Sequence, residues 1–275
     1  MLHSPFFMVG AVVVAIIFLF VIFGPFFLPY EPTQSSLTET FRAPEGFSKG
    51  LDGHILGTDE LGRDVLTRLL IGGRYSLVIA ISVVLIMVIF GTVMGIVAGY
   101  AGGIVDSIIM RLCDIVLAIP NLILAIVFMA VMGISVTNLI FVLAFAGWVE
   151  CCRVTRNNVR VLKNQDFVKA SVSLGASHFH IMFTQILPNV TTPIIILASQ
   201  KIGFTILLEA ALSFLSLGIQ PPIPSWGNMI ANGRTFMTIY PWLVFAPGIA
   251  LMFCVLGFNF LGDGLRDILD PKKRR

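Results

Sequence analysis

Six apolar stretches, separated by polar connections, dominate this 275-residue chain. A helix needs about 20 predominantly apolar residues to cross the hydrocarbon core of a bilayer. Charged residues make up only 12% of the chain, so it cannot cover itself with polar surface. The sequence therefore predicts an all-α integral membrane protein, because backbone groups in lipid must bond within their own segment. The expected spans are Phe6–Leu28, Leu77–Tyr100, Val105–Met132, Asn138–Glu150 (continuing toward Arg153), Val190–Leu217 and Pro241–Gly262.

The spans divide the chain into four parts. Residues 1–30 form an N-terminal transmembrane helix, which lacks the basic start and the small-residue cleavage site of a signal peptide and is expected to be retained. Residues 31–76 form an extracytoplasmic segment. Residues 77–271 contain five further transmembrane helices with one cytoplasmic helix at about 166–180, and residues 272–275 form a basic tail.

Basic residues set the expected orientation. They cluster after the fourth span and again after the sixth, whereas residues 218–240 contain only Arg234. By the positive-inside rule, both clusters lie in the cytoplasm, and an even number of spans places the N-terminus there too. The clusters are Arg153, Arg156, Arg160, Lys163 and Lys169, then Lys272, Lys273, Arg274 and Arg275.

The 31–76 segment is too polar to lie in hydrocarbon, since it carries 5 basic and 7 acidic residues. Residues 31–49 indicate an irregular loop. Thr58 or Asp59 is expected to cap a short interfacial helix that ends at Leu70. That helix either seals the outer mouth against its own spans or offers a surface to a binding protein. Its buried side is expected to hold Leu61, Val65, Leu66 and Leu69, and its polar side Arg63, Asp64 and Arg68.

Between the fourth and fifth spans, residues 167–189 are polar with helical spacing. Such a short amphipathic helix suits docking to another protein at the membrane surface, and its alternative is a helix lying on lipid. The expected apolar stripe is Val168, Val172, Ala176, Phe179 and Phe183.

This segment resembles the cytoplasmic loop of bacterial ABC-importer permeases, whose pattern is Glu-Ala-Ala, three residues, Gly, nine residues, Ile, one residue, Leu-Pro. Aligned on Gly175 and Pro188, Ala170 matches the middle alanine. Lys169 replaces the glutamate, Ser171 the last alanine and Gln185 the isoleucine. The charge reversal at Lys169 removes any ion pair that the glutamate makes.

Three longer segments resemble the dipeptide, oligopeptide and nickel permease family, in its second-permease, DppC/OppC-like type. They are GTDELGRDVLTRLLIGGRYSL at 57–77, LLEAALSFLSLGIQPPIPSWGNMIANGR at 207–234 and FNFLGDGLRDILDP at 258–271. The resemblance implies six helices in a type I ABC-importer architecture in the bacterial cytoplasmic (inner) membrane. It implies import of dipeptides or oligopeptides, or of nickel or a metal–chelator complex.

The resemblance also implies partners: a second permease in a heterodimer, two ATP-binding subunits and an extracytoplasmic substrate-binding protein, besides membrane lipid and without nucleic acid. None of the lysines follows a glycine, so the chain lacks a phosphate-binding Gly-Lys-Ser/Thr loop and is not expected to be an enzyme. No cofactor is expected in this chain, and ATP and magnesium belong to the partner subunits. The expected ATPase contacts are Lys169, Ala170, Ser171, Gly175, Ala176 and Pro188.

Ionisable residues within the spans leave another function class open. Arg111 and Asp114 are spaced to pair on one helix face, as are Lys201 and Glu209, and Glu150 closes the fourth span. They suit either ion pairs between helices or the relay of an ion-coupled secondary transporter that works without ATPase subunits. A membrane scaffold without transport is the third hypothesis.

Small residues and prolines predict local features of the spans. Gly91, Gly95 and Gly99 predict close helix contact, within this chain or with a partner permease. Pro120 and Pro247 are expected to bend the third and sixth spans, for packing or for an alternating pathway. His178 and His180, two residues apart on a helix, are not expected to share a metal.

Overall fold

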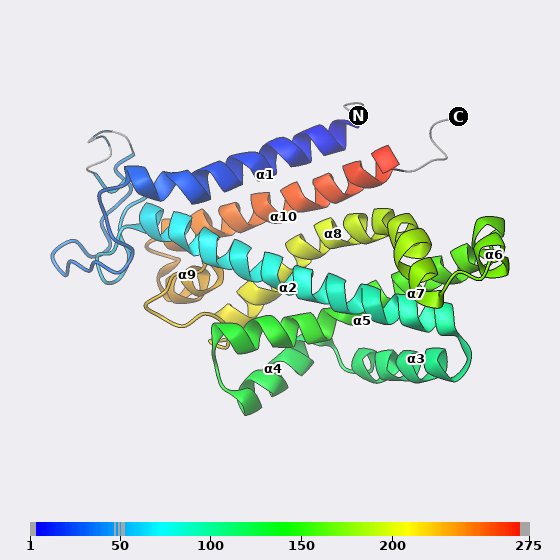
Figure 1. Cartoon of the computed structure of the whole chain (residues 1–275). Helices are drawn as coiled ribbons and strands as arrows, with labels where there is room; N and C mark the ends of the chain where they lie inside the picture. The colour runs from blue at the N-terminus through cyan, green and yellow to red at the C-terminus, as the bar shows by residue number, and fades with distance from the viewer. Residues whose placement is uncertain (1–3, 47, 49, 51–52, 270–275) are drawn as a thin grey trace.

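The computed structural model describes residues 4–46, 48, 50 and 53–269, so the basic tail 272–275 lies outside the described residues. The chain folds into a bundle of long helices (Figure 1). Its elements are α1 (Pro5–Phe23), η1 (Gly24–Phe27), α2 (Val65–Ala101), α3 (Gly103–Leu117), α4 (Asn121–Met132), α5 (Val136–Lys163), α6 (Asp166–Ser173), α7 (His178–His180), the π-helical η3 (Ile181–Ile186), α8 (Leu187–Phe214), α9 (Trp226–Gly233), η4 (Arg234–Phe236) and α10 (Trp242–Leu269).

Five continuous helical segments in the described residues are long and apolar enough to span a membrane, and a sixth span is possible if α3 and α4 count as one. These two helices meet at 85° instead of forming the single Val105–Met132 helix predicted from the sequence. Pro120 stands at the break with an extended ψ of 134°. Proline lacks an amide hydrogen and disfavours helical geometry in the residue before it, so it breaks this span outright.

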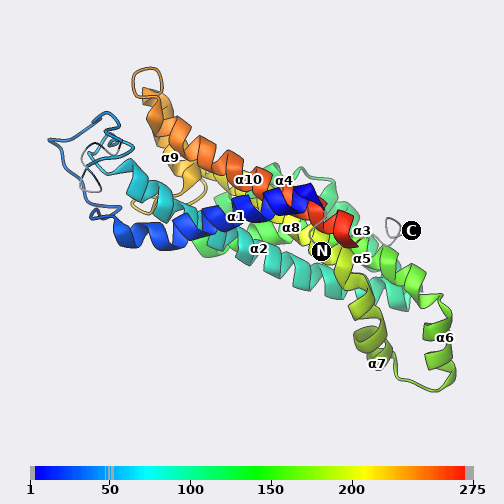
Figure 2. The same ribbon diagram turned by 90° about the horizontal axis from the view of Figure 1, so that it is seen from above.

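The two ends of the bundle carry different structures. The start of α1 and the end of α10 lie at the same end as α6 and α7, whereas α9 and the long connection between η1 and α2 lie at the other (Figures 1 and 2). An even number of crossings gives this arrangement. It agrees with the sequence-based topology without fixing which end is cytoplasmic.

The helix expected from Asp59 to Leu70 is not a separate element. Gly62 has a φ of +70°, and the Asp59 carboxylate accepts hydrogen bonds from the amides of Leu61 and Arg63, which fixes a turn there. The helix begins only at Val65. It then continues unbroken for 37 residues as α2, so the expected boundary at residues 76 and 77 falls inside a helix.

Asp64 is the residue that caps α2. Its carboxylate accepts from the backbone amide of Thr67 at 2.7 Å and from the Thr67 hydroxyl at 2.8 Å. At 1.5 Å per residue the helix is about 55 Å long. That exceeds the roughly 30 Å hydrocarbon core, so α2 projects beyond it.

The glycines of α2 make their close contact within this chain, against α5. A Cβ added at Gly91 would lie 2.6 Å from the Trp148 carbonyl oxygen, and one at Gly95 would lie 2.6 Å from the Cys152 carbonyl oxygen. At Gly99 it would meet Val159 at 2.8 Å. The two backbones therefore approach closely along the last third of α2, which only residues without a side chain permit.

We expect Gly95→Ala to destabilise the bundle by about 1–3 kcal/mol, because the added methyl group overpacks this contact. Gly248→Ala in α10 is the matched control, since no atom of another described element lies within 4 Å of its added Cβ. Thermal unfolding in detergent can be followed with a thiol-reactive dye, because all four cysteines are buried. Equal melting temperatures for the two variants would contradict the packing argument.

Candidate functional site

The connection between α5 and α8 is a helical hairpin and not the single helix expected over 166–180. It projects from one end of the bundle (Figure 2). α6 ends at Ser173, and Gly175 reverses the chain with a φ of +81°. Glycine adopts this left-handed conformation without the strain that a Cβ imposes. The Ser177 hydroxyl then accepts from the His180 amide and caps α7.

This reversal divides the apolar stripe predicted from the sequence. Val168 is buried in a cluster with Ile181 and Ile186, so α6 is packed against the helix that leads into α8. The side chains near the tip stay outside. Leu174 is 87% exposed and Phe179 is 71% exposed. An apolar surface of this kind, at the end of a polar loop, suits contact with another protein.

The six predicted contact residues lie on or beside this hairpin. Ser171 and Ala176 are partly buried, and the other four are exposed. Within the described part of the chain, and apart from the neighbouring residues 174 and 176, no atom lies within 4 Å of a Cβ added at Gly175, so space around the turn is open. The four exposed residues are Lys169, Ala170, Gly175 and Pro188.

Two departures from the permease pattern contact one another. The Gln185 side-chain amide donates a hydrogen bond of 2.6 Å to the Ser171 hydroxyl, which donates in turn to the Phe167 carbonyl. A polar pair thus links α6 to η3 where the pattern has alanine and isoleucine. Sequence spacing could not reveal this contact, since it depends on the reversal at Gly175.

The hairpin is also tied to α2 and α5. The Tyr100 hydroxyl shares a hydrogen bond of 2.8 Å with His178 Nδ1. The Lys163 ammonium donates to the Tyr100 carbonyl and lies 5.2 Å from the centre of its ring. His178 is therefore a structural partner of Tyr100. The hairpin is therefore in contact with α2 through His178 and with α5 and α8 through the cluster around Val168.

Ionisable residues within the spans pair between helices, not along the same helix. Asp114 of α3 pairs with Arg153 of α5, and Lys201 of α8 pairs with Glu150 of α5. Glu209 is fully buried and accepts hydrogen bonds from Ser76 at 3.1 Å and Ser213 at 2.7 Å. The predicted alternatives Arg111–Asp114 and Lys201–Glu209 are therefore not the pairs that form.

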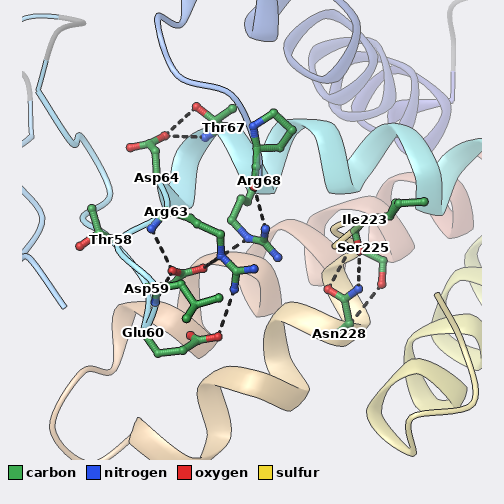
Figure 3. A network of polar contacts seen from close by, with 12 residues as sticks. Thr58, Asp59, Glu60, Arg63, Asp64, Thr67, Arg68, Ile223, Ser225 and Asn228 are labelled. Carbon is green, nitrogen blue, oxygen red and sulfur yellow. Dashed lines mark hydrogen bonds and ion pairs between the residues drawn. The ribbon is translucent and has the colours of Figure 1, made fainter. Parts of the chain in front are cut away.

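At the opposite end of the bundle, the segment that begins with GTDELGRD (residues 57–64) forms a buried ion-pair network with Arg68 (Figure 3). Arg63 Nε donates to Asp59 at 2.7 Å, and its Nη2 donates to Glu60 at 3.1 Å. Arg68 lies 3.5 Å from Asp59 and donates to the Pro32 carbonyl.

The network corrects the predicted polar face of this segment. Arg63, Asp64 and Arg68 are all buried, whereas Leu61, expected on the buried side, is 41% exposed. Val65, at the start of α2, is buried in a cluster with Met229 of α9 and Leu243 of α10. This packing favours the alternative in which the segment closes its end of the bundle against its own helices.

Replacing Asp59 with asparagine is expected to cost about 3–5 kcal/mol of stability, because two buried guanidinium groups lose their shared carboxylate. Glu60→Gln is the control, since the Glu60 side chain is 25% exposed and its loss should cost about 1 kcal/mol or less. Thermal unfolding of the two purified variants measures the difference. Equal losses would show that Asp59 does not hold the network.

Comparison with known proteins identifies the family. The model for the binding-protein-dependent transport system inner membrane component matches residues 91–275, which is more than half of the chain. The chain belongs to this family. The model for the N-terminal TM domain of oligopeptide transport permease C matches residues 1–44. The predicted resemblance to ABC-importer permeases is therefore confirmed, as is the all-α membrane fold.

Named relatives cover nearly the whole chain. The dipeptide transport system permease protein DppC of Haemophilus influenzae is 39% identical over 98% of this chain and 91% of its own length. The oligopeptide transport system permease protein OppC of Bacillus subtilis is 36% identical over 98% and 86%. The glutathione transport system permease protein GsiD of Pectobacterium atrosepticum is 41% identical over 90% and 80%. Members of this family are permeases that work with ATPase and substrate-binding partners, which displaces the secondary-carrier and scaffold hypotheses.

Proposed function

We propose that this chain forms one half of the membrane path of an ABC importer for dipeptides or short oligopeptides. The observation that carries the substrate class is the near full-length similarity to relatives named for dipeptide, oligopeptide and glutathione transport. In this proposal a second permease completes the path, and two ATP-binding subunits supply energy from ATP and magnesium. A binding protein delivers peptide at the outer face.

The α6–α7 hairpin is the proposed contact with one ATP-binding subunit. Its tip presents exposed apolar side chains, while its base is fastened to three long helices through Val168, the Ser171–Gln185 hydrogen bond and the Tyr100–His178 hydrogen bond. When nucleotide binding closes the ATPase pair, the hairpin moves as a unit. The attached helices then carry that motion toward the outer end.

Lys169 gives this contact a positive charge where the permease pattern has a negative one. It is exposed on α6 where the permease pattern has a glutamate. An ammonium group at that position suits an acidic or carbonyl partner on the ATPase surface, instead of the basic partner that a carboxylate suits. Ala170 and Gly175 match the small residues of the pattern, so they allow the same close approach of the hairpin to the ATPase subunit.

Uptake by the complete complex in liposomes tests the proposal. We expect labelled dipeptide to enter with ATP hydrolysis, and Gly175→Trp to lower uptake at least about tenfold by filling the open space at the docking turn, equivalent to 1.4 kcal/mol. Gly175→Asn is the matched control, because asparagine tolerates the left-handed conformation. Wild-type uptake by Gly175→Trp would refute the docking role. Uptake of nickel without dipeptide would overturn the substrate class.

The orientation is tested separately, by thiol labelling of Ser48→Cys in intact cells. The four natural cysteines are fully buried and should give little background. A membrane-impermeant reagent should label Cys-substituted position 48 from outside, since we place this loop on the outer face with both termini in the cytoplasm. If position 48 is labelled only when the reagent reaches the inner face, the orientation is the opposite of the proposed one. The hairpin could not then contact cytoplasmic ATPases.

A further inference from the structure

The ion pair between Lys201 and Glu150 lies deep in the membrane-spanning part of the bundle. Lys201 is near the middle of α8, and Glu150 is near the middle of α5. The Lys201 ammonium contacts Glu150 Oε2 and also lies 5.1 Å from the ring centre of Phe204. One ion pair therefore joins α5 to α8 at the depth of the hydrocarbon core of the bilayer.

Glu150 is not enclosed by this chain. Its side chain is 53% exposed, whereas that of Lys201 is 18% exposed. A carboxylate that faced lipid at this depth would be strongly unfavourable, so this surface must meet water or polar groups in the assembled protein. The surface of the bundle around Glu150 is therefore a polar face, unlike the faces that contact lipid.

Neighbouring residues extend the polar face. Asp114 and Arg153 form a second exposed pair, one helical turn along α5 toward α6. A hollow of about 40 Å³ beside Glu150 and Lys201 is lined partly by Asn121 and Thr205. It lies beside the break between α3 and α4. The break therefore leaves polar groups of three helices next to one cavity.

The opposite side of the bundle has a different character. The groove between α1, α2 and α10 is lined by apolar side chains, among them Phe20, Leu69 and Phe253. Such a surface suits contact with lipid tails.

We propose that Glu150 lies on the wall of the aqueous translocation path and contacts the ammonium group of a passing peptide, with Lys201 as the residue that positions it. This inference rests on the proposed function. The exposed part of the carboxylate accepts the ammonium hydrogen bonds while its other edge stays on Lys201. A cationic group on the substrate is the chemical feature that such a contact selects.

Thiol accessibility tests the location. Phe204→Cys and Phe253→Cys are a matched pair, since the two phenylalanines are 47% and 48% exposed and lie in membrane-spanning helices. In the assembled complex, a small water-soluble methanethiosulfonate should label position 204 and not position 253. Equal labelling, or labelling of position 253 alone, would overturn the assignment of the path.

Substrate selectivity tests the contact. Uptake of a free dipeptide and of its N-acetylated form is compared, each at a concentration that saturates the binding protein. Glu150→Gln should lower the preference for the free form about tenfold, because a charge-assisted hydrogen bond is lost. Glu150→Asp should keep the preference. Lys201→Met should reduce it as Glu150→Gln does, and Lys201→Arg should retain it.

The outcomes separate the inference from the proposed function. If the wild-type complex imports no peptide, the proposed function fails. If it imports peptide and Glu150→Gln lowers free and N-acetylated uptake equally, Glu150 has only a structural role and the inference is wrong. An unchanged preference in Glu150→Gln would also refute it.

Discussion

The arrangement of the bundle depends on the close contact between α2 and α5. The glycines of α2 let the backbone of α5 approach without intervening side chains, and this fixes the position of the two helices where the last third of α2 meets residues 148–159 of α5. Because α5 is held in this way, Glu150 and Arg153 reach toward α8 and α3. The same contact carries the end of α5 to the place where the hairpin begins.

Features that depend on composition and on spacing within one segment follow from the sequence alone. The apolar runs predicted the spans to within a few residues at most ends, and the glycine spacing predicted a close helix contact. The family followed from ordered motifs. These features could be predicted because a bilayer tolerates few alternatives to an apolar helix.

Features that depend on a turn or on a neighbouring helix were missed. The reversals at Gly62 and Gly175 ended helical patterns that periodicity alone would continue. Spacing along one helix pairs Asp114 with Arg111 and Lys201 with Glu209, whereas Asp114 and Lys201 both pair with residues of α5. The Ser171–Gln185 hydrogen bond likewise needed the folded hairpin. A single sequence gives helix faces but does not say which faces meet.

The unbroken length of α2 has a mechanical consequence. Near its first turn Arg68 joins the ion-pair network with Asp59, and at its last turn Tyr100 forms a hydrogen bond with the hairpin. The two ends of the molecule are therefore attached to one stiff rod. If such a rod of about 55 Å tilts by about 10°, its ends shift relative to one another by about 10 Å. A small rotation at the hairpin end thus becomes a displacement at the α9 end on the scale of a helix diameter.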